Sequence, residues 1–160
     1  MTRPNKFSVI KPELAPIPSR KVDALVIHHS ASSRTNTSAQ EIERWHKKRD
    51  FTEIGYHFVI NHLGEIIVGR DIEKTPASVK GHNRGTIAVV CTGNFSLDAA
   101  DEPYHPQFLS LARLVNHYRD SIPDLRIVGH RELAATECPG LTVDLDKMQK
   151  YFDAVRELQL

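Results

Sequence analysis

Hydrophobic residues along the chain form two kinds of pattern, and segments of the two kinds alternate. Continuous apolar runs are typical of strands that are buried on both faces of a sheet. Such runs occupy residues 22–29, 86–93 and 125–129. Two shorter runs at 56–60 and 65–68 flank a four-residue turn and predict a β-hairpin.

Apolar residues at helical spacing predict three helices. The first opens at Ser38 with Glu41 three positions later, as in a capping box, and its inner face is expected to hold Ile42 and Trp45. The second runs from Pro106 to about Ser121. The third spans about residues 144–158 and places Leu145, Met148, Phe152 and Val155 on one side.

Strands that alternate with helices, together with a hairpin, predict an α/β fold. We expect a mixed central β-sheet flanked by helices on both sides, in a single domain. Residues 1–20 contain four prolines and little periodicity, so they are expected to form an N-terminal arm on a domain that spans 21–160. In open α/β sheets the reactive site tends to lie beyond the strand ends.

Composition narrows the function classes. The 160 residues are 40% hydrophobic and 26% charged with a net charge of +1, which is ordinary for a globular protein. Lys and Arg are scattered among Asp and Glu, which argues against a nucleic-acid partner, and no apolar run is long enough to insert into a membrane. No apolar segment follows the N-terminus, so we expect a cytoplasmic location. We also expect the protein to be a monomer.

The segment 127–140 carries the strongest chemical signal. His130 follows an apolar run, and Cys138 lies eight positions later in a loop closed by Pro-Gly. Neutral imidazole and thiolate both bind Zn²⁺, and a catalytic zinc needs three protein ligands. The third ligand is expected from the end of the run at 25–29, where alternation along a strand allows either His28 or His29 but not both. A capped strand and a buried thiol explain the same spacing, so spacing alone leaves both interpretations open.

Other polar and aromatic residues admit structural or functional interpretations. Tyr56 lies where a loop enters a strand and either faces a cleft or packs at the strand end. His46 is interpreted as a hydrogen-bonded structural histidine rather than a metal ligand. Cys91, in the middle of an apolar run, is expected to be an inert core thiol that forms no disulfide.

Several separated motifs occur together in one order. They are His28-His29-Ser30-Ala31, Trp45-His46-Lys47, Gly55-Tyr56-His57-Phe58, Gly93-Asn94-Phe95, Gly129-His130-Arg131-Glu132 and Thr136-Glu137-Cys138-Pro139-Gly140. In this order the chain, over about residues 22–152, resembles the zinc-dependent N-acetylmuramoyl-L-alanine amidases of type 2. That superfamily includes short bacteriophage amidase-type lysozymes and peptidoglycan recognition proteins.

The resemblance implies a Zn²⁺ cofactor and a set of site residues. It assigns His28, His130 and Cys138 as metal ligands. Tyr56 matches a catalytic tyrosine that hydrogen-bonds the attacking water or the developing oxyanion, and Thr136 matches a second catalytic position. Some phage enzymes have lysine at that second position, and threonine cannot carry a positive charge, so the source of the proton for the leaving amine stays open.

The resemblance also implies substrate contacts along one wall of the site. We expect these contacts from His57, His82 and Asn83. Related phage enzymes have histidine where this chain has Ser78, and this departure puts the substrate contacts of that wall in question.

The implied reaction is hydrolysis of the amide bond between N-acetylmuramic acid and L-alanine in peptidoglycan. Three biological interpretations stay open. The protein is a phage or prophage endolysin that reaches the wall through a holin-type pore, a cytosolic amidase that recycles muropeptides, or a peptidoglycan-binding module without activity. The presence of Cys138 argues against the third, because family members that only bind commonly lack that ligand.

Overall fold

A computed structural model describes residues 3–99 and 105–160. The described strands are β1 (Val9–Ile10), β2 (Ala24–His29), β3 (Phe58–Ile60), β4 (Ile66–Val68), β5 (Thr86–Cys91) and β6 (Arg126–Gly129). The described helices are α1 (Ala39–Lys48), α2 (Pro106–Ser121) and α3 (Leu145–Leu158), with the short 3-10 turns η1 (Pro12–Leu14) and η2 (His130–Glu132). Each predicted strand and helix is present, within two residues at either end.

The strands form one six-stranded sheet in the order β1-β4-β3-β5-β2-β6. β2 is parallel to both of its neighbours, β5 and β6, and β3 is parallel to β5. The β3–β4 hairpin and the β1–β4 pair are antiparallel, which confirms the predicted mixed sheet. Sequence reasoning missed β1, which is two residues long and has no alternation that could distinguish it from a proline-rich loop.

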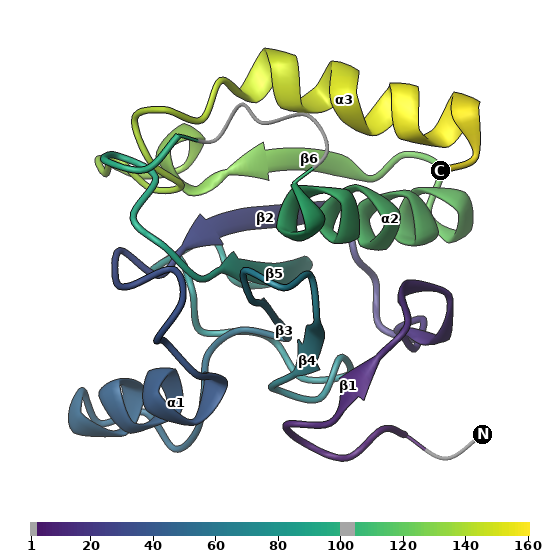
Figure 1. Cartoon of the computed structure of the whole chain (residues 1–160). Coiled ribbons are helices and arrows are strands. Elements are labelled where there is room, and N and C mark those ends of the chain that lie inside the picture. Colours follow the sequence, from purple (N-terminus) through teal and green to yellow (C-terminus); the bar gives the residue numbers. More distant parts are fainter. Residues whose placement is uncertain (1–2, 100–104) are drawn as a thin grey trace.

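Helices cover both faces of the sheet, as predicted, but unequally. α2 and α3 lie together on one face, where they pack on the larger apolar core, and α1 lies on the other near the strand ends (Figure 1). The N-terminal segment packs against α2, since the Tyr118 hydroxyl donates to the Pro16 carbonyl at 2.9 Å. In the described part of the chain, no helix has the length and apolar character needed to cross a membrane.

Local sequence explains the helix boundaries. Ser38 caps α1 by accepting a hydrogen bond from the Glu41 N–H at 3.1 Å, and Asp144 caps α3 in the same way. The predicted inner face of α1 is wrong in one respect, because Trp45 is exposed and His46 is buried in its place. Ala39, Ile42 and His46 are spaced by three and four residues, so they share the stripe that faces the sheet.

Candidate functional site

The sheet register brings two of the predicted ligands together. Ile27 of β2 pairs with Gly129 of β6, so the next residues, His28 and His130, leave two neighbouring parallel strands at the same level. Their rings lie 4.8 Å apart between centroids. His28 is buried, whereas His130 at the start of η2 is half-buried. The pair therefore lies together at the carboxyl ends of these two strands.

Cys138 completes the cluster from the loop that follows η2. Its Sγ lies 3.7 Å from Nδ1 of His28, and one ligand atom from each of His28, His130 and Cys138 lies within 4.8 Å of the others. A nitrogen and a sulfur ligand on one tetrahedral Zn²⁺ are about 3.5 Å apart. The three side chains thus have the types and the spacing that a three-ligand catalytic zinc site requires.

Burial sets the protonation of these groups. Desolvation, with smaller contributions from neighbouring histidines, holds the pKa of His28 well below its ordinary value, and burial also lowers the pKa of His130. Both rings are therefore neutral at pH 7, as metal ligands must be. Nε2 of His28 is buried and has no hydrogen-bond partner among the described residues. Such an unpaired buried nitrogen is uncommon in a folded protein. The ring nitrogen that lies beside Cys138 Sγ is Nδ1, so Nδ1 is the atom of His28 that would bind a metal.

The Cys138 thiol is also tuned by its surroundings. Burial raises its pKa to about 11, although the backbone N–H of His29 donates to Sγ at 3.3 Å and favours the thiolate. A bound divalent cation offsets this burial, because a coordinated thiol is deprotonated outright. The donor set, two neutral imidazoles and one thiol beside a backbone donor, fits zinc.

The loop that carries Cys138 is fixed by its own neighbours. Arg131 donates to the carbonyls of Gly140, at 2.8 Å, and Val143, so its guanidinium spans the base of the loop. The hydroxyl of Thr136 accepts from the Cys138 N–H at 3.2 Å, and Thr136 itself is exposed at the rim. Thr136 is therefore an exposed residue that contacts the backbone of Cys138.

His29 points away from this cluster. Its Nδ1 accepts from the Phe95 N–H at 3.0 Å on the opposite face of the strand, as alternation along β2 requires. The Phe95 carbonyl in turn accepts from the Thr142 N–H at 2.8 Å, just beyond the Cys138 loop. Sequence reasoning did not assign His29 this role as a hydrogen-bond acceptor. The only hint in the sequence was the alternation along the strand, which places His29 on the opposite face from His28.

Tyr56 lies against the candidate metal-ligand cluster formed by His28, His130 and Cys138. Its ring centroid is 5.0 Å from that of His28. Burial, together with the nearby Cys138 thiol, raises the pKa of its phenol above the ordinary value. Tyr56 therefore stays protonated throughout the neutral range and can serve as a hydrogen-bond donor.

The predicted substrate-contact residues separate into three environments. His57 is fully buried, and its ring accepts from the Ala88 N–H at 3.0 Å and lies 2.8 Å from the Lys74 carbonyl, so it offers no surface to a substrate. Asn83 holds its own loop, since its Oδ1 accepts from the N–H groups of Ser78 and Val79 at 2.8 and 2.9 Å. His82 is exposed and makes the best candidate of the three for an external contact.

Comparisons with known proteins agree with this geometry. The family model described as N-acetylmuramoyl-L-alanine amidase matches residues 18–141. The endolysin of Enterobacteria phage K11 is 32% identical over 129 residues, which cover 78% of this chain and 83% of the relative. A peptidoglycan recognition protein of Trichoplusia ni is 28% identical over 76% of this chain and 71% of its own length.

Solved structures share the fold. The N-acetylmuramoyl-L-alanine amidase endolysin LysCS from Clostridium intestinale superposes with a TM-score of 0.75 at 22% identity, over 95% of this chain and 93% of the other. Drosophila peptidoglycan recognition protein SD superposes with a TM-score of 0.70 at 23% identity, over 83% of this chain and 84% of the other. With the family match across most of the sequence, these findings show that the chain belongs to the N-acetylmuramoyl-L-alanine amidase family.

Proposed function

We propose that this protein hydrolyses the amide bond between the lactyl group of N-acetylmuramic acid and L-alanine in peptidoglycan, with one Zn²⁺ as cofactor. Membership of the amidase family supports the reaction class. The observation that carries the zinc proposal is the convergence of His28, His130 and Cys138, whose ligand atoms lie within 4.8 Å of one another. A Zn²⁺ held by these three side chains would keep a coordination position for water or substrate.

The metal and the protein divide the chemistry. When bound, Zn²⁺ supplies Lewis-acid polarisation of the amide carbonyl and of an attacking water molecule. His28 and His130 stay neutral because burial lowers their pKa values, so they hold a cation without competing protons at pH 7. Water adds across the C–N bond, which leaves a lactyl carboxylate on the sugar and a free amino group on L-alanine.

Tyr56 is proposed to stabilise the charge that develops during this addition. Its phenol stays protonated because burial raises its pKa, so it is available to donate a hydrogen bond toward the tetrahedral oxyanion. One such donor contributes about 3–4 kcal/mol of transition-state stabilisation in other enzymes. This role is supported by the distance of 5.0 Å between the ring centroids of Tyr56 and His28.

Thr136 is proposed to assist the same step from the rim. Its hydroxyl accepts from the Cys138 N–H at 3.2 Å, which leaves its own proton to donate to substrate. Threonine carries no positive charge, unlike the lysine found at this position in some phage enzymes. The attacking water is therefore the simplest source of the proton that the leaving amine gains. Of the wall residues, exposed His82 is proposed to contact substrate, and Asn83 is proposed to shape the loop that presents it.

We infer an endolysin role from the phage relatives. Endolysins of phages K11 and T7 are each 32% identical to the chain, which spans 83% and 80% of their lengths. The protein would be made inside the host cell and act on the wall after release through a holin-type pore. The relatives named peptidoglycan recognition proteins keep a binding module as the second candidate. An intact His28, His130 and Cys138 cluster favours the enzyme.

The direct test is the identity of the product. Purified sacculi incubated with the protein should release stem peptides that carry a free N-terminal L-alanine, with no new reducing sugar ends. Mass spectrometry of the released material distinguishes this cleavage from cutting of the glycan or of peptide cross-links. Cleavage of soluble muropeptides but not of intact sacculi would favour the recycling role, and binding without any cleavage would favour the recognition module.

A further inference from the structure

Helix α1 presents two hydrogen-bond acceptors to the loop that carries Tyr56. Glu43 and His46 are three positions apart and therefore neighbours on the helix surface. Oε2 of Glu43 accepts from the Ile54 N–H at 3.1 Å, and Nδ1 of His46 accepts from the Gly55 N–H at 2.8 Å. Two consecutive backbone donors immediately before Tyr56 are thus held by one helix.

The His46 ring also touches Tyr56 directly. Their ring centroids are 5.2 Å apart and tilted by 54°, while the Tyr56 ring makes a similar contact with His28 at 5.0 Å. Because Nδ1 of His46 accepts a hydrogen bond, its proton is on Nε2 in the neutral ring. Burial, with Arg49 and Arg70 nearby, lowers the pKa of His46 to about 4, so the ring keeps this acceptor at pH 7.

On the side away from α1, the residues before Tyr56 pack closely against the loop that contains Ala77. A Cβ on Gly55 would lie 2.1 Å from the Ala77 carbonyl oxygen, so only glycine fits there. The Ala77 N–H donates to the Gly55 carbonyl at 3.1 Å, and Nε of Arg70 donates to the Ile54 carbonyl at 3.0 Å. The residues before Tyr56 are therefore pressed between α1 and the loop at 75–85.

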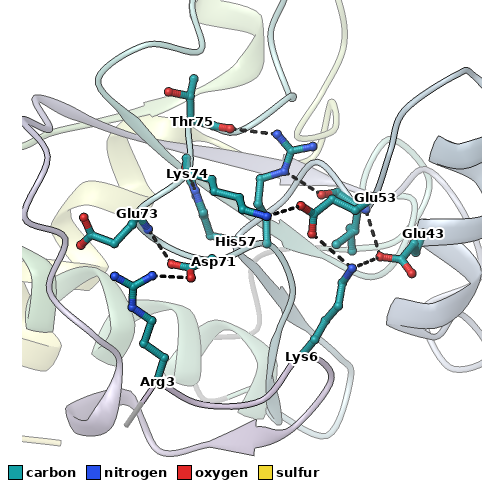
Figure 2. A network of polar contacts seen from close by, with 11 residues as sticks. Arg3, Lys6, Glu43, Glu53, His57, Asp71, Glu73, Lys74 and Thr75 are labelled. Carbon is teal, nitrogen blue, oxygen red and sulfur yellow. Dashed lines mark hydrogen bonds and ion pairs between the residues drawn. The ribbon is translucent and has the colours of Figure 1, made fainter. Parts of the chain in front are cut away.

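Ion pairs hold the carboxylate end of this contact. Burial alone would raise the pKa of Glu43, but hydrogen bonds from Lys6 and from the Ile54 N–H hold it below the ordinary value, so the acceptor stays ionised. Nζ of Lys6 lies 2.5 Å from Glu43 and 3.1 Å from Glu53, and Lys74 also pairs with Glu53 at 3.1 Å. Figure 2 shows Lys6 between the two carboxylates, with Lys74 on the far side of Glu53.

We propose that His46, assisted by Glu43, is a positioning residue for Tyr56. Through Gly55 and through its ring contact, His46 sets where the phenol hydroxyl lies relative to the metal-ligand cluster. The residue touches no reacting atom, and this role rests on the proposed catalytic function of Tyr56. Misplacement of a catalytic group by about 1 Å costs on the order of a hundredfold in rate, which gives such a residue a measurable share.

The test compares two substitutions at one position, alone and with Tyr56→Phe. His46→Leu keeps much of the volume but removes the acceptor, whereas His46→Asn keeps an acceptor at the same distance along the side chain. With a soluble muropeptide as substrate, His46→Leu should lower kcat by about 10- to 100-fold, and His46→Asn should stay within about threefold of wild type. In the Tyr56→Phe background, His46→Leu should change kcat by less than about twofold, because the hydroxyl that it positions is gone.

Controls separate positioning from loss of stability. Asn116→Leu removes a buried hydrogen bond from Nδ2 to the Phe152 carbonyl on the opposite face, and it should lower the melting temperature but leave kcat unchanged. Zinc content should be the same in all variants. If His46→Leu does not fold, Glu43→Leu removes the carboxylate that accepts from the Ile54 N–H, and this variant should show the same cancellation with Tyr56→Phe.

The outcomes distinguish the positioning role of His46 from the catalytic role of Tyr56. A loss with His46→Leu that His46→Asn restores and Tyr56→Phe cancels supports positioning. If Tyr56→Phe lowers kcat but the folded His46→Leu variant does not, or if the His46→Leu loss is equally large with Phe at position 56, positioning is overturned while the proposed function stands. If Tyr56→Phe leaves kcat unchanged, the catalytic role of Tyr56 falls, and positioning falls with it.

Discussion

The two faces of the sheet are built on different physical terms. On the α2 and α3 face, large side chains such as Leu111, Leu114 and Phe152 are fully buried in one extended apolar core. On the α1 face, the buried apolar cluster is small, and the same space holds His28, Tyr56 and His46. The difference suggests that one face supplies most of the stability, while the other is free to hold polar groups for chemistry.

The contacts on the α1 face are correspondingly specific. His46 and Glu43 each accept a hydrogen bond from one defined backbone N–H. Hydrogen bonds of this kind contribute about 1 kcal/mol each to stability, far less than burial of a large side chain, but they fix positions closely. Substitutions on the two faces should therefore affect different measurements.

The largest expected effect is that of Cys138→Ser. Serine has a similar size but is a neutral hydroxyl at pH 7 and a much poorer zinc ligand. We expect hydrolysis to fall by about three orders of magnitude or more, the scale of losing one member of a catalytic unit, while peptidoglycan binding survives. Turbidity loss and sacculus pull-down measure the two properties side by side. Cleavage at the wild-type rate would show that Cys138 is not a ligand.

The opposite face should respond in stability alone. Leu114 lies on α2 with no exposed surface, so Leu114→Ala should lower the free energy of unfolding by about 2–5 kcal/mol through lost burial and a residual cavity. Well below the melting temperature, kcat should stay within about twofold of wild type. Urea unfolding and initial rates on a soluble muropeptide test the two statements. A large loss of kcat in the folded variant would contradict the division between the faces.

His57 makes the stability of the protein depend on pH. Its pKa of about 4, lowered mainly by burial, is below the 6.5 of an unfolded histidine. Between these values the unfolded chain binds a proton that the folded chain does not, so stability falls as the pH decreases from about 6.5 toward 4. At pH 5 the free energy of unfolding is therefore lower than at pH 7 by about 2 kcal/mol from His57 alone, given the size of the pKa shift.

The comparison of wild type with His57→Gln isolates this contribution. Between pH 7 and pH 5, the wild-type free energy of unfolding should decrease by about 1–2 kcal/mol more than that of the variant, because glutamine does not titrate. Urea titrations at both pH values give the difference. Equal decreases in the two proteins would mean that His57 is not held neutral by the fold.

Thr136→Val should have the smallest effect. It removes the hydroxyl that accepts from the Cys138 N–H but keeps the branched shape, so kcat should fall by about fivefold, in line with one neutral hydrogen bond. Thr136→Ser keeps the hydroxyl and should remain near wild type. If the Thr136→Val and Thr136→Ser variants have the same kcat, the hydroxyl has no part in the reaction.

The fold was largely predictable because its core elements have strong periodic patterns. α2 begins and ends at the predicted residues, since Pro106 fixes its start and Phe108, Leu111 and Tyr118 define one stripe. The inner face of α1 was predicted wrongly because hydrophobicity favours Trp45 over His46. The structure buries His46 because Gly55 offers it a backbone N–H, and that partner lies nine residues away along the chain.

The candidate site was predictable in part. The types and order of the ligands were visible in the sequence, and the parallel register of β2 and β6 explains why His28 and His130 meet. His57 was expected at the substrate, but its ring satisfies the Ala88 N–H inside the fold. Such backbone partners leave no trace in sequence pattern, because any residue can supply them.

The central claim is that His28, His130 and Cys138 hold one catalytic Zn²⁺, and metal content measured together with activity tests it most directly. The wild-type protein should contain about one zinc per chain, lose both zinc and hydrolysis to a chelator, and regain both on addition of Zn²⁺. Its far-UV circular dichroism should persist without metal, because the core on the α2 and α3 face does not depend on the site. Full hydrolysis by protein that contains no metal would contradict the claim.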